Sequence, residues 1–345
     1  MRRILLTAMV LLAPLMIARA AWDGTNDFYD DAPTADLGRP RLIVNGEVAD
    51  PGPIDLSRMP LRSAIVKETR LTGDTAAFVG AYRYDGYSLY DILDRCVVRK
   101  KNEQEFPRAI DVFVVVSNAA GDQVVLSWGE IYYPNDRHRI LVATRVARIV
   151  PSKTKDLWPL PRRSRLVVGP DLVSDRNIDE PTTITVRSYP RSFPPAGETS
   201  NLHSPVIHVY HAGSVEDSIT AGQRFGTMAE YPTVFYGRGK GIHGISRFRG
   251  APLKSLLAAS WSSSVASLRR GLVTVAALDG YRSVFTYAEI FNRNDQNEVL
   301  LVPRAAGQEG GAYSLFAPAD FFSDRAVKAV TEIRYDLLDS LVFDR

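Results

Sequence analysis

The 345-residue chain contains a single cysteine, Cys96, and this scarcity excludes several kinds of structure. One thiol cannot form an internal disulfide, and it cannot supply a cysteine-based metal cage. The chain also lacks the Gly-x-Ser-x-Gly elbow of hydrolases, a His-Glu-x-x-His zinc motif and a complete phosphate-binding loop. None of these short motifs therefore identifies a reaction.

Net charge is also small. The chain has 42 Lys and Arg residues against 39 Asp and Glu residues. The first 20 residues contain Arg2, Arg3 and Arg19 and no acid, so the remainder has 39 residues of each sign. A formally neutral chain argues against a general nucleic-acid or membrane-surface binder.

Long apolar runs are scarce except at the N-terminus. Ile4–Ile17 is apolar, follows an arginine pair and precedes the small-residue sequence Ala18-Arg19-Ala20. This order is typical of a signal peptide cleaved before Ala21. The alternative, a membrane anchor, is disfavoured because the run is short for a bilayer span. We therefore expect a periplasmic or secreted protein without a membrane span after cleavage.

The chain does contain an internal repeat. Tyr84–Leu93 (YDGYSLYDIL) and Phe248–Leu257 (FRGAPLKSLL) lie 164 residues apart and share an aromatic residue, a glycine and leucines at helical spacing. Each predicts a glycine turn, at Gly86 or Gly250, that leads into a short amphipathic helix. The apolar positions that we expect to be buried include Leu89, Leu93, Leu253 and Leu257.

Three further pairs of segments repeat in the same order. The pairs are 42–48 with 209–215, 114–131 with 273–290, and 171–176 with 320–325. The second pair ends in Glu-Ile in both copies, at Glu130 and Glu289. Both copies of the third pair begin with aspartate and end with arginine. Because loops absorb insertions while elements persist, the sequence predicts a duplicated unit.

The repeat gives a division of the chain. We predict a signal peptide at 1–20, an acidic leader at 21–39, a first lobe at 40–188, a linker rich in proline at 189–204 and a second lobe at 205–345. At 45% hydrophobic residues, the chain can fill two ordinary cores.

Some repeated positions match a known family. Phe248–Leu257, and more loosely Tyr84–Leu93, follow the pattern W-x-G-V-x-L-x-x-L-L. Asp279-Gly280-Tyr281 precedes an apolar strand and Glu289, and a late segment carries Pro318, Asp320 and Arg325. In these features each lobe resembles the molybdopterin-binding domain of the sulfite-oxidase-like oxidoreductases. The resemblance implies an α+β fold of two similar lobes, with mixed sheets or a partly open barrel flanked by short helices.

The chain departs from that family at the metal ligand. The resemblance implies a cysteine thiolate upstream of the glycine–helix motif, but neither 66–83 nor 234–247 contains cysteine. Cys96 follows the motif and has no copy in the second lobe, so we expect it to be a buried, small apolar residue. A soft, high-valent metal needs such a thiolate. We therefore expect no metal centre and no cofactor, with molybdopterin as the possible exception.

The loop Tyr236–Gly244 is the candidate binding site. Its glycines allow backbone amides to approach an anion, and basic side chains supply charge. The predicted anion- or pterin-binding residues are Arg238, Lys240, His243 and Arg247. The alternative is a flexible hairpin whose basic residues lie in water.

Other clusters favour structural roles. His203, His208 and His211 are close in sequence, but the last two would point to opposite faces of a strand, so surface or structural histidines are favoured over metal ligands. The repeated Asp–Arg segments at 171–176 and 320–325 are typical of loop caps at a strand.

Two functions remain open. The first is an exported, non-catalytic tandem of molybdopterin-oxidoreductase-like domains that binds a small anionic ligand or a periplasmic protein partner, with no nucleic acid. The second is a molybdopterin-dependent oxidoreductase with an atypical cofactor site. Molybdenum or tungsten at one equivalent per chain would favour the second.

Overall fold

A computed structural model describes residues 32–343, apart from 74, 152–153, 197–203, 238–240, 262 and 305–310. The side chain of His243 is also not described. The predicted signal peptide and most of the predicted acidic leader lie outside the described residues. Export and the predicted localisation therefore stay predictions.

Two sheets are built from the first half of the chain. One has the order β1-β8-β5-β4, with β9 paired to β8. Its strands are β1 (Ala35–Asp36), β4 (Arg62–Thr72), β5 (Thr75–Ser88), β8 (Ile140–Arg148) and β9 (Arg165–Val168). The other has the order β3-β2-β10-β6-β7. Its strands are β2 (Ile43–Gly46), β3 (Gly52–Pro53), β6 (Val112–Asn118), β7 (Gln123–Ser127) and β10 (Pro181–Ser188).

Two more sheets come from the second half. One has the order β12-β11-β19-β15-β16 and the other β13-β14-β17-β18. The first contains β11 (Val206–His211), β12 (Ser214–Thr220), β15 (Gly271–Ala277), β16 (Arg282–Thr286) and β19 (Val330–Leu337). The second contains β13 (Ala229–Gly237), β14 (Gly241–Pro252), β17 (Leu300–Pro303) and β18 (Tyr313–Phe316).

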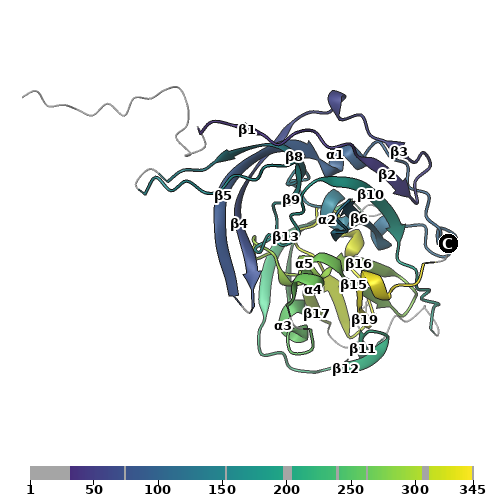
Figure 1. Cartoon of the computed structure of the whole chain (residues 1–345). Helices are drawn as coiled ribbons and strands as arrows, with labels where there is room; N and C mark the ends of the chain where they lie inside the picture. Colours follow the sequence, from purple (N-terminus) through teal and green to yellow (C-terminus); the bar gives the residue numbers. More distant parts are fainter. Residues whose placement is uncertain are drawn as a thin grey trace, which may run out of the picture.

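The helices are short. The α-helices are α1 (Leu89–Leu93), α2 (Trp128–Tyr132), α3 (Leu253–Leu257), α4 (Val265–Arg270) and α5 (Tyr287–Phe291). Single 3₁₀ turns lie at η1 (Leu56–Arg58), η2 (Ala109–Asp111), η4 (Ser323–Arg325) and η5 (Leu338–Ser340). In Figure 1, α2 and α5 lie near the centre of the view, between the purple-to-teal first half and the green-to-yellow second half.

The strand pairing of the first half recurs in the second. Strands β2 to β10 and β11 to β19 pair in the same order, so that each strand corresponds to the one nine places later, and β1 is the only strand outside this pattern among the described residues. Both halves include one parallel pair, β2 with β10 and β11 with β19. The pairing agrees with a duplicated unit, whereas the predicted domain boundaries stay predictions.

The predicted fold class is wrong. Strands account for 46% of the described residues and helices for 13%, and the four small sheets are arranged as the blades of a four-bladed β-propeller. This is not the α+β, two-lobed molybdopterin-domain fold that the resemblance implied, so the sulfite-oxidase-like fold assignment is wrong with it. The physical reason is that each helical segment lasts only five or six residues and is attached directly to a strand, with β5 before α1, β14 before α3 and β15 after α4.

The two repeated glycines show this difference locally. Gly86 and Gly250 do not form turns; they lie within β5 and β14, which run directly into α1 and α3. A Cβ on Gly86 would lie 2.3 Å from the Val142 carbonyl oxygen, and one on Gly250 would lie 2.6 Å from the Leu301 carbonyl oxygen. The glycines are therefore needed for the close approach of a neighbouring strand.

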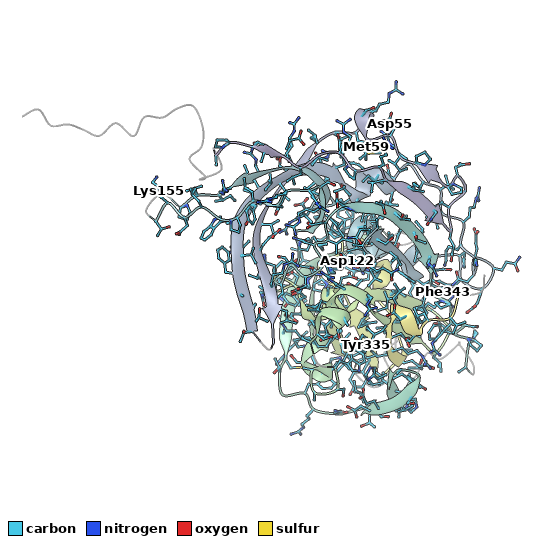
Figure 2. All side chains as sticks on the ribbon, in the orientation of Figure 1. Asp55, Met59, Asp122, Lys155, Tyr335 and Phe343 are labelled. Carbon is cyan, nitrogen blue, oxygen red and sulfur yellow. The ribbon has the colours of Figure 1, made fainter. Side chains whose placement is uncertain are left out.

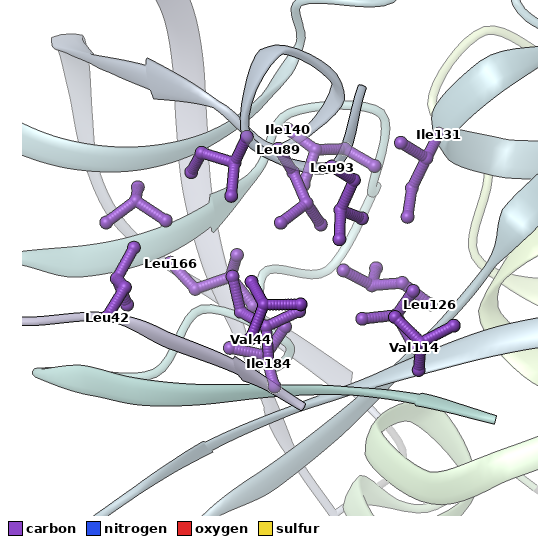
Figure 3. Close-up of a cluster of buried hydrophobic side chains, with 14 of the residues drawn as sticks. Leu42, Val44, Leu89, Leu93, Val114, Leu126, Ile131, Ile140, Leu166 and Ile184 are labelled. Carbon is purple, nitrogen blue, oxygen red and sulfur yellow. The ribbon is translucent and has the colours of Figure 1, made fainter. Parts of the chain in front are cut away.

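The predicted burial of the helix leucines is confirmed. Leu89, Leu93 and Leu253 have no exposed surface, and Leu257 is 2% exposed. In Figure 3, Leu89 and Leu93 of α1 lie on one side of the first core and point toward Val44 of β2 and Ile184 of β10. In the second half, Leu253 and Leu257 of α3 have the same spacing and pack into the core of that half.

A further core joins the two halves. It contains residues of β6, β7, β15 and β16 together with the start of the predicted linker and the C-terminal residues. Its buried members are Phe113, Val115, Val125, Tyr189, Phe193, Leu272, Ala276, Val284, Leu338 and Leu341. Phe343, labelled in Figure 2, packs on it with its ring 6.2 Å from that of Phe113. The first residues of the predicted linker are thus part of a core.

Candidate functional site

Helices α2 and α5 begin in the same way, and each presents a glutamate to the interior. Ser127 caps α2: its hydroxyl accepts from the Glu130 N–H at 2.9 Å, and the Glu130 carboxylate accepts from the Ser127 N–H at 2.8 Å. Thr286 and Glu289 form the same reciprocal pair at α5, at 3.1 and 2.9 Å. This capping box follows from Ser or Thr placed three residues before Glu at the end of a buried strand.

Each glutamate binds an arginine that lies later in the chain. The Arg176 guanidinium donates to both oxygens of Glu130, with Nη1–Oε1 at 3.0 Å and Nη2–Oε2 at 2.9 Å. Arg325 donates from Nη1 to Oε1 of Glu289 at 2.8 Å. Hydrogen bonds donated by a charged guanidinium are stronger than neutral ones, so these contacts fix the arginines in place.

The same arginines bind an aspartate five residues earlier. Arg176 donates to Asp171 through Nε at 2.8 Å and Nη2 at 2.6 Å. Arg325 donates to Asp320 through Nε and Nη2, both at 2.7 Å. We call Asp171, Arg176 and Glu130 the first triad, and Asp320, Arg325 and Glu289 the second triad. None of these six side chains is more than 7% exposed.

The triads contact the opposite half of the chain. Arg176 Nη1 donates to the Thr286 hydroxyl at 3.3 Å, and Arg325 Nη1 donates to the Ser127 hydroxyl at 3.3 Å. Gly129 lets Arg325 reach this place, since a Cβ there would lie 2.2 Å from Arg325 Nη1. The first turns of α2 and α5 are therefore joined through the two arginines.

A cavity of about 220 Å³, which we call the central cavity, opens onto both triads. Its charged lining residues are the carboxylates Glu130, Asp136, Asp171, Glu289, Asp295 and Asp320 and the guanidinium groups of Arg139, Arg176, Arg293 and Arg325. Six carboxylates against four guanidiniums give an excess of two negative charges when all are ionised. The remaining lining residues are prolines, alanines and two asparagines: Pro134, Asn135, Pro170, Ala288, Asn297, Pro318 and Ala319.

Burial changes the acidity of the carboxyl groups. The pKa of Glu130 is raised to about 7, because burial penalises its charged form and the Glu289 charge adds repulsion, while Arg176 acts in the opposite direction. Burial likewise raises the pKa of Asp171 and of Asp320, and Arg176 and Arg325 oppose that rise. Glu130 is therefore a group at this site whose charge changes near neutral pH.

The residues predicted as an anion site are not part of this cavity where they can be placed. Arg238 and Lys240 lie outside the described residues, and the side chain of His243 is not described. Arg247 lies on β14, is exposed, and pairs with Glu230 of β13 at 3.0 Å. An anion or pterin pocket at this hairpin stays a prediction.

The sequence did contain the triads, but in separate pieces. The repeated Glu-Ile ends and the repeated Asp–Arg segments each appear twice, and the Asp–Arg segments are typical of loop caps. The structure shows that Arg176 and Arg325 connect these pieces, over 46 and 36 residues of sequence. In each half a segment that ends in Glu-Ile is followed by a segment with an aspartate and an arginine. This repeated order was the signal in the sequence for a shared charge network.

The residues do not fit a thiolate-held molybdenum centre. Cys96 is half-buried beside α1, packs against the first core, and its Sγ contacts the Ile92 carbonyl oxygen at 3.9 Å. It does not line the central cavity, whose donors are carboxylate oxygens and guanidinium groups. Within the described part of the chain, no group of three or more His, Cys, Asp or Glu side chains is placed to hold a metal ion.

Comparison with known proteins adds no family. No protein-family model matches the chain, and no curated protein sequence matches it. These comparisons do not identify a sulfite-oxidase-like domain. In the part of the chain that the structure describes, no helix is long and apolar enough to span a membrane.

Proposed function

We propose that this protein is a binding protein that takes a small organic cation in the central cavity. The observation that carries the proposal is the excess of carboxylates over guanidinium groups around a space of about 220 Å³. Pockets for drug-sized ligands are larger, about 300–1,000 Å³, so the ligand is a compact molecule. A compound with one or two ammonium groups has the size and charge that this lining favours.

The arginines of the triads are not available to an anion. Arg176 and Arg325 each bind one aspartate through two nitrogens and also a glutamate. Arg293, also in the lining, binds Asp295 through two nitrogens. An anion would have to compete with these carboxylates, whereas a cation could bind the free lone pairs of the same oxygens.

The titration of Glu130 links this binding to pH. A cation near the carboxyl group favours its charged form and lowers its pKa. Binding should therefore release a proton from Glu130 when the pH is near or below 7, and the affinity should rise as the pH increases through about 7. A purely structural cluster would show no such coupling to a ligand.

The test is isothermal titration calorimetry with 1,4-diammoniobutane, using succinate as an anion of equal carbon number. We expect the diammonium compound to bind at pH 8 and to bind more weakly at pH 6, and succinate not to bind. Titrations in buffers of different ionisation enthalpy count the released proton. Glu130→Gln should abolish the proton release, and Asp50→Asn, which removes an exposed carboxylate, should retain it. Binding of succinate alone, or of neither compound, would contradict the proposal.

A further inference from the structure

A second pocket lies on the other side of α2, and it is lined by aromatic rings and arginines. Its volume is about 480 Å³. The lining consists of Pro107, Arg108, Ala109, Ile110, Trp128, Tyr132, Tyr133, Arg137, Phe322 and Asp324. We call it the aromatic pocket. Glu130 faces the central cavity from α2, while Trp128 and Tyr132 line this second space from the same helix.

The aromatic rings provide flat surfaces. Trp128 and Tyr132 stack with ring centres 4.3 Å apart and planes at 16°, and Tyr133 meets Phe322 edge-on at 6.1 Å. Trp128 is 8% exposed, so most of its indole is covered. Such walls favour a planar ring that can stack or meet their edges.

The two arginines of the lining provide positive charge. Arg137 donates a hydrogen bond to the Tyr90 hydroxyl at 3.2 Å and lies over that ring, with Cζ 5.2 Å from its centre. Arg108 is exposed, with Cζ 5.3 Å from the centre of the Tyr281 ring. Among the described residues, neither guanidinium forms an ion pair with a carboxylate. Asp324, the one acid in the lining, accepts from the Tyr133 hydroxyl at 3.4 Å.

The corresponding place in the second half is filled. Tyr287 and Phe291 are 159 residues after Trp128 and Tyr132 and stack in the same way, at 4.3 Å and 8°. There, however, Trp261 packs against Phe291 and its carbonyl oxygen accepts from the Tyr287 hydroxyl, and both Tyr287 and Trp261 are at most 2% exposed. Helix α4 stands before β15 where the first half has only the 3₁₀ turn η2 before β6. In the first half the stacked pair thus lines a pocket, whereas the pair of the second half is packed against Trp261.

We propose that the aromatic pocket binds a planar aromatic carboxylate. The ring would lie against Tyr132, the partly exposed member of the stacked pair, and the carboxylate would be bound by Arg108 and Arg137, whose planar guanidinium groups match carboxylate geometry. This site is separate from the central cavity and takes a ligand of the opposite charge, so the proposal does not depend on the proposed function.

The test uses calorimetric titration of the full chain with 2-naphthoate. Two probes separate the contributions: 2-naphthylmethylammonium has the same ring with a positive charge, and cyclohexanecarboxylate has the charge without a planar ring. We expect 2-naphthoate to bind at least tenfold more tightly than either. Comparable binding of the ammonium probe, or no binding of 2-naphthoate at millimolar concentration, would overturn the proposal.

Variants locate the site. Arg108→Gln and Arg137→Gln should each weaken 2-naphthoate binding about tenfold, the effect of losing one hydrogen bond to a charged group. Arg249→Gln, which changes an exposed arginine on β14, should leave binding unchanged. Because Arg108 is exposed, its variant should fold, which circular dichroism can verify. Unchanged binding in both pocket variants would assign the ligand to another surface and overturn the proposal.

Discussion

Arg176 and Arg325 are each surrounded by two carboxylates, and their environment explains why they can be buried. Taking a charge out of water is costly, and the cost is recovered only when the geometry is good and the remaining hydrogen-bonding groups are used. Each arginine donates to an aspartate through two nitrogens and to a glutamate. A substitution that moves one of these guanidinium groups should therefore reduce the free energy of unfolding by more than its small change in side-chain size suggests.

Gly129 is such a residue. In Gly129→Ala the new methyl group would lie 2.2 Å from Arg325 Nη1 and displace it from Glu289. We expect the free energy of unfolding to fall by about 1–3 kcal/mol, the usual cost of overpacking. Urea unfolding measures this. The matched control is Ala288→Gly, at the corresponding position of α5, which moves no arginine; it should cost about 1 kcal/mol through helix propensity and a similar amount, about 0.8 kcal/mol, through loss of a buried methyl group. A Gly129→Ala protein as stable as the wild type would show that Arg325 can move freely.

Glu130 should make stability depend on pH. Its pKa is raised from 4.5 to about 7 in the folded protein, so the folded state holds the proton more tightly than the unfolded state does. This contribution is fully present below about pH 4.5 and is lost as the pH rises through about 7. The raised pKa values of Asp171 and Asp320 act in the same direction at their own pH ranges.

The corresponding experiment measures the melting temperature between pH 5 and 8. We expect the wild-type value to fall over this range and the fall to be smaller in Glu130→Gln. Asp50→Asn, which changes an exposed carboxylate, should keep the wild-type slope. Equal slopes in the wild type and Glu130→Gln would mean that Glu130 is ionised throughout this pH range, which would contradict its raised pKa.

At the scale of elements, each half uses a strand that turns directly into a single helical turn. The leucine spacing of 89–93 and 253–257 was enough to predict these helices and their buried faces. The role of the preceding glycine was not predictable, because it depends on β8 or β17, the strands that pass close to it. The local sequence pattern thus identified the helices. The glycines are required by contacts with strands that lie about fifty residues later in the chain, which the local pattern does not contain.

Gly250→Ala tests this contact. A Cβ would lie 2.6 Å from the Leu301 carbonyl oxygen, which is backbone and cannot move aside alone. We expect a loss of about 1–3 kcal/mol in the free energy of unfolding, through overpacking. Gly52→Ala is the control, because no atom lies within 4 Å of the position that its methyl group would take and its backbone is extended. Equal losses in both variants would indicate a general glycine effect in strands and no specific contact.

At the scale of the whole molecule, the arrangement of the sheets follows from long-range pairing that a single sequence does not display. The repeat predicted that similar elements occur twice. In the structure, strands β11–β19 pair in the same order as strands β2–β10. The propeller arrangement depends on which sheets face each other. It also depends on pairs such as β2 with β10, whose residues are 140 positions apart. Composition and spacing leave such pairings open, and the family resemblance chose the wrong arrangement.

The shared core should make the two halves unfold together. Phe113 and Val125 of the first half pack in one cluster with Leu272 and Val284 of the second, and the triads join the halves through hydrogen bonds. We expect a single cooperative transition in urea. Trp261 is the one tryptophan of the second half, and Trp22, Trp128 and Trp158 precede it in the first half of the sequence. A protein with those three changed to Phe reports the second half, and Trp261→Phe reports the first.

Leu272→Ala is the decisive variant for this coupling. Leu272 is fully buried, so its truncation should reduce the free energy of unfolding by about 2–5 kcal/mol. Because the side chain lies in the core that both halves share, the transition seen in each half should move to lower urea by the same amount. Leu253→Ala, in the core of the second half alone, is the matched control for the size of the loss. If Leu272→Ala shifts only the second-half signal, or if the wild type shows two separate transitions, the halves are independent folding units and the shared core is only a contact between them.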